Sequence, residues 1–245
     1  MVDGYSAQQI REAEAPLLAA GEPLMQRAAA ALAQEILREI AALHDHPDAA
    51  SIVVLAGSGN NGGDALFAAA ELAQRGCDVA IVQVGSRIHA EGLAAAEAAG
   101  ARRIDAPGAR DVANLAAASV VIIDAILGTG SGGNPALRGF AREVVEALLP
   151  IVEADDGPRV VAVDIPSGID PDDGTVPDPT VLPADVTVTF GAYKAGLLIE
   201  PAASLAGDIR LVDIGLGDQL AGMKPLVKVR NVSSRPVSLG RQAPS

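Results

Sequence analysis

The sequence predicts an α/β fold with a mostly parallel sheet that helices cover on both faces. From Ser51 onward, short apolar segments with the length of strands alternate with segments that have helical periodicity. The strand segments are apolar almost throughout, which is typical of parallel strands buried on both faces. Connections between the elements are short, so we expect one domain in this span.

Two helices are predicted before the first of these strands. A capping box that begins at Ser6 opens the first helix, and Pro16 is expected to end it. Pro23 suits the first turn of the second helix. Apolar residues recur at helical spacing in this second helix, which predicts one buried face: Met25, Ala28, Leu32, Ile36 and Ile40. The polar connector that follows holds His44 and His46, which we interpret as solvated residues and not as metal ligands.

The alternating region yields six strands and four helices. The predicted strands are Ile52–Leu55, Val79–Val84, Val120–Asp124, Val160–Asp164, Val186–Phe190 and Ile209–Ile214. The predicted helices are Asp64–Arg75, His89–Ala99, Arg110–Ala117 and Leu137–Leu149. Residues 1–216 are therefore expected to form the folded domain.

The last residues, 217–245, differ in composition from the rest. They contain five basic residues and one acidic residue, so the net charge of −13 becomes −17 for the preceding body. Prolines, serines and the lack of periodicity predict a basic, flexible tail, although Lys224 to Val232 could add an edge strand.

Composition argues against several classes of protein. The acidic charge opposes non-specific binding to nucleic acid, and three Phe, two Tyr and no Trp leave few side chains for base stacking. Cys77 is the lone cysteine, which excludes an intramolecular disulfide framework and a cysteine-rich zinc site. No signal peptide or membrane-spanning run is visible, so we expect a cytoplasmic protein without membrane contact.

A glycine-rich turn after the first strand is the clearest functional pattern. Gly57, Gly59 and Gly62 fit the G-x-G-x-x-G spacing between a strand and a helix, where free N–H groups favour an anion such as a pyrophosphate. The acidic residue that usually holds the ribose 2′-OH is missing, because the second strand is followed by Gly85-Ser86-Arg87. The amides of Asn60-Asn61 within the turn could hold a cation or fix a polar ligand.

Two further strands end in aspartates that precede glycine-containing loops. Asp124 and Asp164 are expected at the same edge of the sheet as the glycine-rich turn, where α/β proteins bind ligands. No histidine lies in these motifs, so a Ser-His-Asp mechanism is unsupported, and proton transfer falls to a carboxylate. Oxygen donors suit a hard cation rather than zinc or copper. Lys194, after the next strand, is expected to be solvated.

Four motifs in order resemble the NAD(P)H-hydrate epimerases, the family of the YjeF amino-terminal domain. They are Gly57-Ser-Gly-Asn-Asn-Gly-Gly-Asp64, Asp124-Ala-Ile-Leu-Gly-Thr-Gly130, Val163-Asp-Ile-Pro-Ser-Gly168 and Phe190-Gly-Ala-Tyr-Lys-Ala-Gly196. The opening segments Ile10–Glu14 and Gly21–Ala28 fit as well, so the likeness runs from about Tyr5 to Gly215.

The resemblance implies a Rossmann-like three-layer sandwich, often dimeric, and therefore a homodimer. The implied reaction interconverts the R and S forms of hydrated NADH and NADPH (NADHX and NADPHX), so that a partner dehydratase that accepts only the S form can repair both. That dehydratase also occurs fused to this domain.

The resemblance also implies site residues. The implied substrate-binding residues are Asn60, Asn61, Gly62, Gly63, Asp64, Gly128, Thr129, Gly130, Ser131, Gly132, Gly133, Asn134 and Asp164. Potassium, the implied cofactor, would be bound by Asn61, Asp124 and Ser167. Asp164 is our candidate for the catalytic acid/base.

Two other interpretations remain open. The first is a non-catalytic nucleotide-binding or scaffold domain on the same fold, since the fold does not fix the function. The intact Asp164 and Asn61, together with the acidic body, argue against it. The second is an NAD(P) oxidoreductase in which Arg87 takes a 2′-phosphate, and the lack of a marked hydride-transfer residue weakens it.

Overall fold

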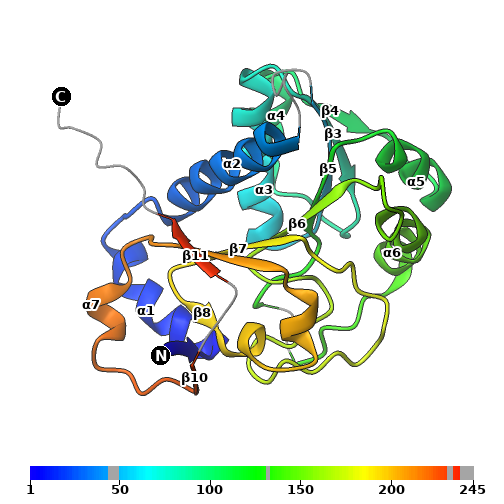
Figure 1. Cartoon of the computed structure of the whole chain (residues 1–245). Helices are drawn as coiled ribbons and strands as arrows, with labels where there is room; N and C mark the ends of the chain where they lie inside the picture. The colour runs from blue at the N-terminus through cyan, green and yellow to red at the C-terminus, as the bar shows by residue number, and fades with distance from the viewer. Residues whose placement is uncertain (44–49, 131–132, 231–233, 238–245) are drawn as a thin grey trace.

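The computed structural model describes residues 1–43, 50–130, 133–230 and 234–237. Its centre is an eight-stranded sheet with the order β11-β9-β7-β6-β5-β2-β3-β4, in which every adjacent pair is parallel (Figure 1). The strands are β2 (Ser51–Ala56), β3 (Asp78–Gln83), β4 (Arg102–Ile104), β5 (Val121–Ala125), β6 (Arg159–Val163), β7 (Val186–Phe190), β9 (Asp208–Val212) and β11 (Ser234–Val237). The predicted parallel α/β fold is confirmed.

Helices form the outer two layers. They are α1 (Ala7–Ala19), α2 (Leu24–Leu43), α3 (Asn60–Gln74), α4 (Ala90–Ala98), α5 (Ala109–Ala117), α6 (Gly139–Val152) and the short α7 (Gly217–Leu220). One apolar cluster joins α2, α3 and α4 to the sheet, and a second joins α5 and α6 to its other face. Successive strand residues alternate between the clusters, as Val53 and Val54 do, because side chains of a strand point to opposite faces.

A second, three-stranded sheet lies beside the main one. Its order is β10 (Val227–Val229), β1 (Val2–Tyr5) and β8 (Tyr193–Lys194), with β10 antiparallel to β1 and β8 parallel to it. This small sheet brings the N-terminal segment, and with it α1, to the end of the main sheet where β7 finishes (Figure 1). Strand β10 lies within the segment from Lys224 to Val232 where an edge strand was expected. Strands β1 and β8 carry too few residues to show a period of two, so the sequence did not reveal them.

The predicted strands are all present, with boundaries shifted by at most two residues, but three helix boundaries were wrong. Helix α6 continues past Leu149 to Val152, with Pro150 inside it. Pro16 lies inside α1, which continues to Ala19, and the Ser6 capping box is present as predicted. Helix α3 begins at Asn60 and not at Asp64, so the Asn-Asn-Gly-Gly segment forms its first turn. This turn can be helical because the missing side chain of Gly62 leaves room for the carbonyl of Gly57.

The basic segment 217–245 is not simply a flexible tail. Leu220 of α7 is buried, β10 pairs with β1, and β11 adds a parallel strand beyond β9. Backbone pairing decides this outcome, because the unpaired edges of β1 and β9 each offer a row of hydrogen-bonding groups. Residues 231–233 and 238–245, like His44 and His46, lie outside the described residues.

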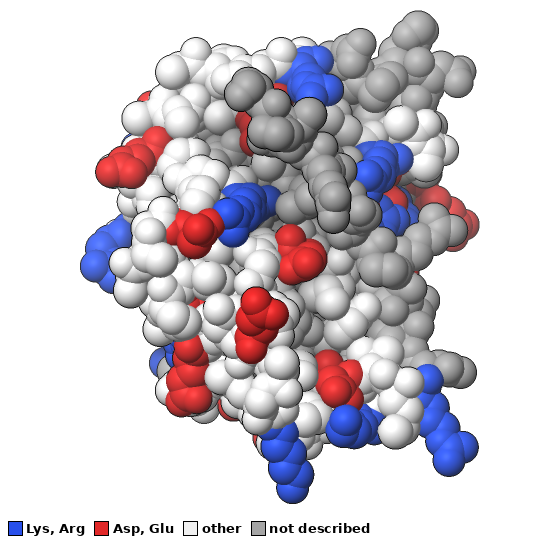
Figure 2. Space-filling view, turned by 90° about the vertical axis from the view of Figure 1, so that its left-hand side faces the viewer, with Lys and Arg blue, Asp and Glu red and all other residues white. Residues whose placement is uncertain are grey.

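The surface carries charged side chains of both signs. Figure 2 shows acidic and basic side chains interspersed over the described part of the face that carries α1 and α7, with no continuous basic surface there. Within the described ranges, no helix is long and apolar enough to cross a membrane.

Truncation after Leu216 should therefore destabilise the protein. It removes β10, β11 and the buried side chain of Leu220, and we expect the free energy of unfolding to fall by at least about 2 kcal/mol. Chemical denaturation of this variant and of a control that ends at Val237 measures the effect. Equal stability of the truncated and full chains would show that the two strands contribute nothing to the fold.

Candidate active site

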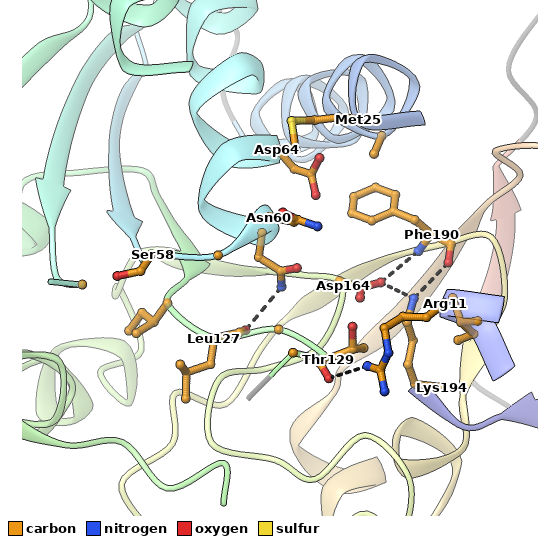
Figure 3. A pocket seen from close by; sticks show the side chains of 18 of the residues that line it. Arg11, Met25, Ser58, Asn60, Asp64, Leu127, Thr129, Asp164, Phe190 and Lys194 are labelled. Atoms are coloured by element: carbon orange, nitrogen blue, oxygen red, sulfur yellow. Dashed lines mark hydrogen bonds and ion pairs between the residues drawn. The ribbon is translucent and has the colours of Figure 1, made fainter. Parts of the chain in front are cut away.

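A cavity of about 770 Å³ lies at the carboxyl ends of the central strands. Strand β2 is flanked by β3, which follows it in sequence, and by β5, which follows only after β4, so the strand order reverses at β2. Such a reversal leaves a crevice between the loops on the two sides, where open α/β sheets bind their ligands. The loops after β2, β3, β5 and β6 line the cavity, and α1 and α2 add residues from the N-terminal segment (Figure 3).

The glycine-rich turn closes the cavity floor by tight backbone packing. A Cβ atom on Gly57 would lie 1.8 Å from the carbonyl oxygen of Ile126, and one on Gly62 would lie 2.4 Å from that of Gly57. These glycines let the turn after β2 touch the loop after β5. Helix α3 starts directly behind it, with Gly59 as its N-cap, so the first N–H groups of α3 begin at the cavity.

Asp164 follows the last residue of β6 in an unusual backbone conformation. Its φ angle is +68°, in the left-handed region that non-glycine residues seldom adopt, and its N–H donates to the carbonyl of Val188 at 2.7 Å. Its carboxylate Oδ1 accepts hydrogen bonds from the Thr189 hydroxyl and the Phe190 N–H, each at 3.2 Å. Strained residues held by their surroundings are concentrated at functional sites, and Asp164 lines the cavity.

Lys194 is paired with Asp164, which contradicts the expectation of a solvated lysine. Only 2% of the residue is exposed, and its ammonium contacts Asp164 Oδ1 directly. It also donates to the Phe190 carbonyl at 2.9 Å and to the Thr189 hydroxyl at 3.2 Å. The sequence indicated only that Lys194 follows a strand end. Whether the lysine loses its water and pairs with Asp164 depends on how the surrounding segments pack.

Two more carboxyl groups share this end of the cavity. Burial raises the pKa of Asp64 well above its ordinary value, and the nearby charges of Asp164 and Glu14 raise it further, against the opposing effect of Lys194. Burial also raises the pKa of Glu14, which Lys194 opposes. A carboxylate paired with an ammonium thus stands beside two carboxyl groups with raised pKa values, an arrangement suited to proton transfer.

Sequence reasoning missed Glu14. Helix α1 reaches the cavity because β1 is inserted between β10 and β8, and such a contact between distant segments leaves no local pattern. The helical spacing of Ile10 and Glu14, both of which line the cavity, places them on one face of α1, but it does not show which part of the protein that face meets.

Asn61, Asp124 and Ser167, the residues that the resemblance implies for potassium, lie close together, and Asn61 also lines the cavity. Asp124 is fully buried, and its carboxylate accepts hydrogen bonds from the Ser167 hydroxyl at 2.6 Å and the Ser167 N–H at 2.8 Å. The Asn61 amide lies 2.6 Å from the carbonyl of Val163 and 3.3 Å from that of Leu127. Burial raises the pKa of Asp124, while the hydrogen bonds from Ser167 and Ile126 oppose the rise.

The predicted substrate-binding residues divide into two groups. Those that line the cavity are Asn60, Asn61, Asp64, Gly128, Thr129, Gly130, Asn134 and Asp164. Gly62, Gly63 and Gly133 do not line it. Gly62 packs on Gly57 within the turn, and a Cβ on Gly63 would lie 3.1 Å from the ring of His89 at the start of α4. Ser131 and Gly132 lie outside the described residues.

This fold and site define a Rossmann-like α/β protein with a polar, carboxylate-rich pocket at its switch point. Residues 21–196 match the family described as YjeF-related protein N-terminus, which is most of the chain, and the chain belongs to this family. The fold agrees with the crystal structure of yeast ynu0 (YNL200c), with a TM-score of 0.67 and 22% identity over 80% of this chain and 83% of that one.

Curated relatives extend the match to nearly the whole chain. The NAD(P)H-hydrate epimerase of Clavibacter michiganensis subsp. michiganensis is 54% identical over 93% of this chain and 96% of that protein. That of Microbacterium testaceum is 49% identical over 92% and 84%, respectively. The bifunctional NAD(P)H-hydrate repair enzyme Nnr of Mycobacterium tuberculosis is 42% identical over 86% of this chain, which spans 41% of that protein.

Substitutions in the glycine-rich turn test whether its close backbone packing requires glycine. Gly57→Ala should lower the free energy of unfolding by about 2–3 kcal/mol, because the new methyl group meets rigid backbone. Gly59→Ala is the matched control. Its Cβ has no neighbour within 4 Å, so we expect a loss below about 1 kcal/mol, from the poorer N-cap alone. Equal losses by chemical denaturation would contradict this account of the turn.

Proposed function

We propose that this protein is an isomerase that interconverts the R and S epimers of NADHX and NADPHX. The observation that carries the proposal is the pair of Asp164 and Lys194 facing Asp64 across one cavity at the switch point of the sheet (Figure 3). Family membership and relatives named NAD(P)H-hydrate epimerase that match almost end to end support it.

The chemistry requires a proton to be given and a proton to be taken. The hydrated ring carries a hydroxyl group on the carbon beside the ring nitrogen. Electrons from that nitrogen expel the hydroxyl, which must be protonated to leave as water. Water then adds to the other face of the resulting iminium ion and loses a proton, which inverts the centre.

The two buried carboxyl groups suit these two tasks. Asp64, with its raised pKa, holds the proton that the leaving hydroxyl needs. Asp164, whose carboxylate is held by Lys194, accepts the proton of the incoming water. When the proton has passed from Asp164 back to Asp64, the cycle can repeat. No oxidation state changes, so no redox partner is needed. Lys194 is a positioning residue, since its ammonium holds Asp164 and does not react.

The oxygen-rich group beneath the cavity fits a potassium ion. Asp124 is buried without a cationic partner among the described residues, and Ser167 and Asn61 supply further oxygen atoms with the carbonyls of Leu127 and Val163. A bound potassium ion would neutralise Asp124 and fix the loops after β5 and β6, from which the cavity-lining Gly128 and Asp164 extend.

Partners follow from the substrate. The bifunctional relatives carry this domain within a longer repair enzyme, so we propose an NAD(P)H-hydrate dehydratase as the functional partner. We also propose that the protein acts as a homodimer in the cytoplasm, where soluble nicotinamide nucleotides are its substrates.

Replacing Asp164 by Asn should abolish most of the epimerisation. The amide keeps the shape of the side chain but cannot accept a proton, and general acid–base catalysis contributes about 10²–10⁴-fold. We therefore expect kcat to fall at least about 100-fold, with a much smaller change in substrate affinity. Chromatography that separates the two epimers of NADHX measures the exchange rate above the spontaneous one.

Asp105→Asn is the control, because Asp105 is exposed and lies away from the cavity. It should turn over like the wild type. If Asp164→Asn retained activity within a few-fold of wild type, Asp164 would not be the base. If it lost binding and rate equally, it would be a binding residue.

Potassium should stabilise the wild type but not Asp124→Asn. Ligand binding raises the free energy of unfolding by about 2.7 kcal/mol at 100 times the dissociation constant. The melting temperature, followed in increasing KCl with choline chloride at equal ionic strength as the control, should therefore rise for the wild type alone. The same rise in both proteins would remove Asp124 from the potassium site.

A further inference from the structure

The side of the cavity next to β3 is basic. Two arginines line it, Arg87 after β3 and Arg138 at the N-cap of α6, and both are exposed to solvent. A third arginine of the cavity, Arg11 of α1, donates instead to the carbonyl of Thr129 and lies near Glu14. Among the described residues, neither guanidinium has an acidic partner within ion-pair distance. In a chain with a net charge of −13, two arginines without acidic partners on one side of a cavity indicate that this side binds an anionic group.

The fold brings these arginines to the same place. Val84, three residues before Arg87, packs in one apolar cluster with Leu137 and Ala141, which stand on either side of Arg138. All three apolar residues also line the cavity. The carboxyl groups that line the cavity gather at the other end, where Asp64, Asp164 and Glu14 influence one another.

The segment that carries Arg87 is fixed against the glycine-rich turn. The backbone N–H of Arg87 donates to the hydroxyl of Ser58 at 3.1 Å, and a Cβ on Gly85 would lie 2.3 Å from the same oxygen. Strand β3 is the parallel neighbour of β2, with Gln83 opposite Ala56. Arg87 therefore stands beside the start of α3, one strand further along the sheet.

In dinucleotide-binding sites, the loop after the second strand contacts the adenosine ribose. With the diphosphate at the start of the helix after the first strand, the adenosine ribose lies over the end of the second strand. An acidic residue there binds a free 2′-OH, whereas an arginine nearby accommodates a 2′-phosphate. Here β3 is followed by Ser86 and Arg87, with no acidic residue in the loop up to Ile88.

We propose that Arg87 and Arg138 bind the 2′-phosphate of the substrate and make NADPHX the preferred substrate over NADHX. The inference rests on the proposed function, since it assigns the specificity of that same site. The hydrated nicotinamide then lies at the end with Asp164 and Lys194, and the phosphorylated ribose lies at the end with the two arginines. Guanidinium groups suit this task because they bind phosphate oxygens through two parallel hydrogen bonds.

The kinetic test compares the two substrates in each variant. The ratio of kcat/KM for NADPHX to that for NADHX should exceed one in the wild type and fall about 10–100-fold in Arg87→Ala and in Arg138→Ala, as expected for the loss of a charged hydrogen bond. Arg110→Ala is the matched control, because Arg110 is exposed on α5 and does not line the cavity. Its ratio should equal that of the wild type.

A binding experiment separates this inference from the proposed function. Calorimetry with adenosine 2′,5′-bisphosphate and adenosine 5′-monophosphate needs no catalysis. The wild type should bind the bisphosphate at least about tenfold more tightly, and Arg87→Ala should lose that difference. If the protein turns over neither epimer, the proposed function is wrong, but the binding experiment still shows whether the arginines bind a 2′-phosphate. A substrate ratio that does not change in Arg87→Ala, or equal affinity of the wild type for the two nucleotides, would overturn the inference.

Discussion

The buried ion pair of Asp164 and Lys194 is the interaction on which the site depends. Taking two charges out of water is costly, and such a pair survives only where hydrogen bonds complete its coordination. Thr189 and Phe190 supply them, so the end of β7 holds a charge that sits at the end of β6. Removing one partner would leave an uncompensated buried charge, at a cost of about 3–5 kcal/mol. The pair therefore fixes the position of the Asp164 carboxylate.

The charges around this pair explain why three carboxyl groups can share one cavity. One ammonium balances one carboxylate, and burial then favours the neutral forms of Asp64 and Glu14. Such a site places carboxyl groups with raised pKa values beside an ion-paired carboxylate, without a histidine. This division of roles matches a reaction that must protonate one oxygen and deprotonate another.

The cavity is also divided along its length by charge. Three carboxyl groups lie close to Lys194 and to Arg11 of α1, while Arg87 and Arg138 lie after β3 and at the start of α6. A long, anionic nucleotide with a reactive ring at one end fits such a division better than a small, neutral substrate does. The strand order creates this separation of charged groups, because the loops on either side of β2 come from opposite halves of the sheet.

The sequence by itself determined the parallel α/β fold, the central strands and most of the site. Continuous apolar strands can be buried only between two layers of helices, and parallel strands place Asp124, Asp164 and the glycine-rich turn at one edge. Tertiary structure alone decided the burial of Lys194, the arrival of Glu14 with α1, and the pairing of β10 and β11. Each of these depends on contacts between segments far apart in the chain, whose free energy comes from desolvation and backbone pairing and leaves no local pattern in the sequence.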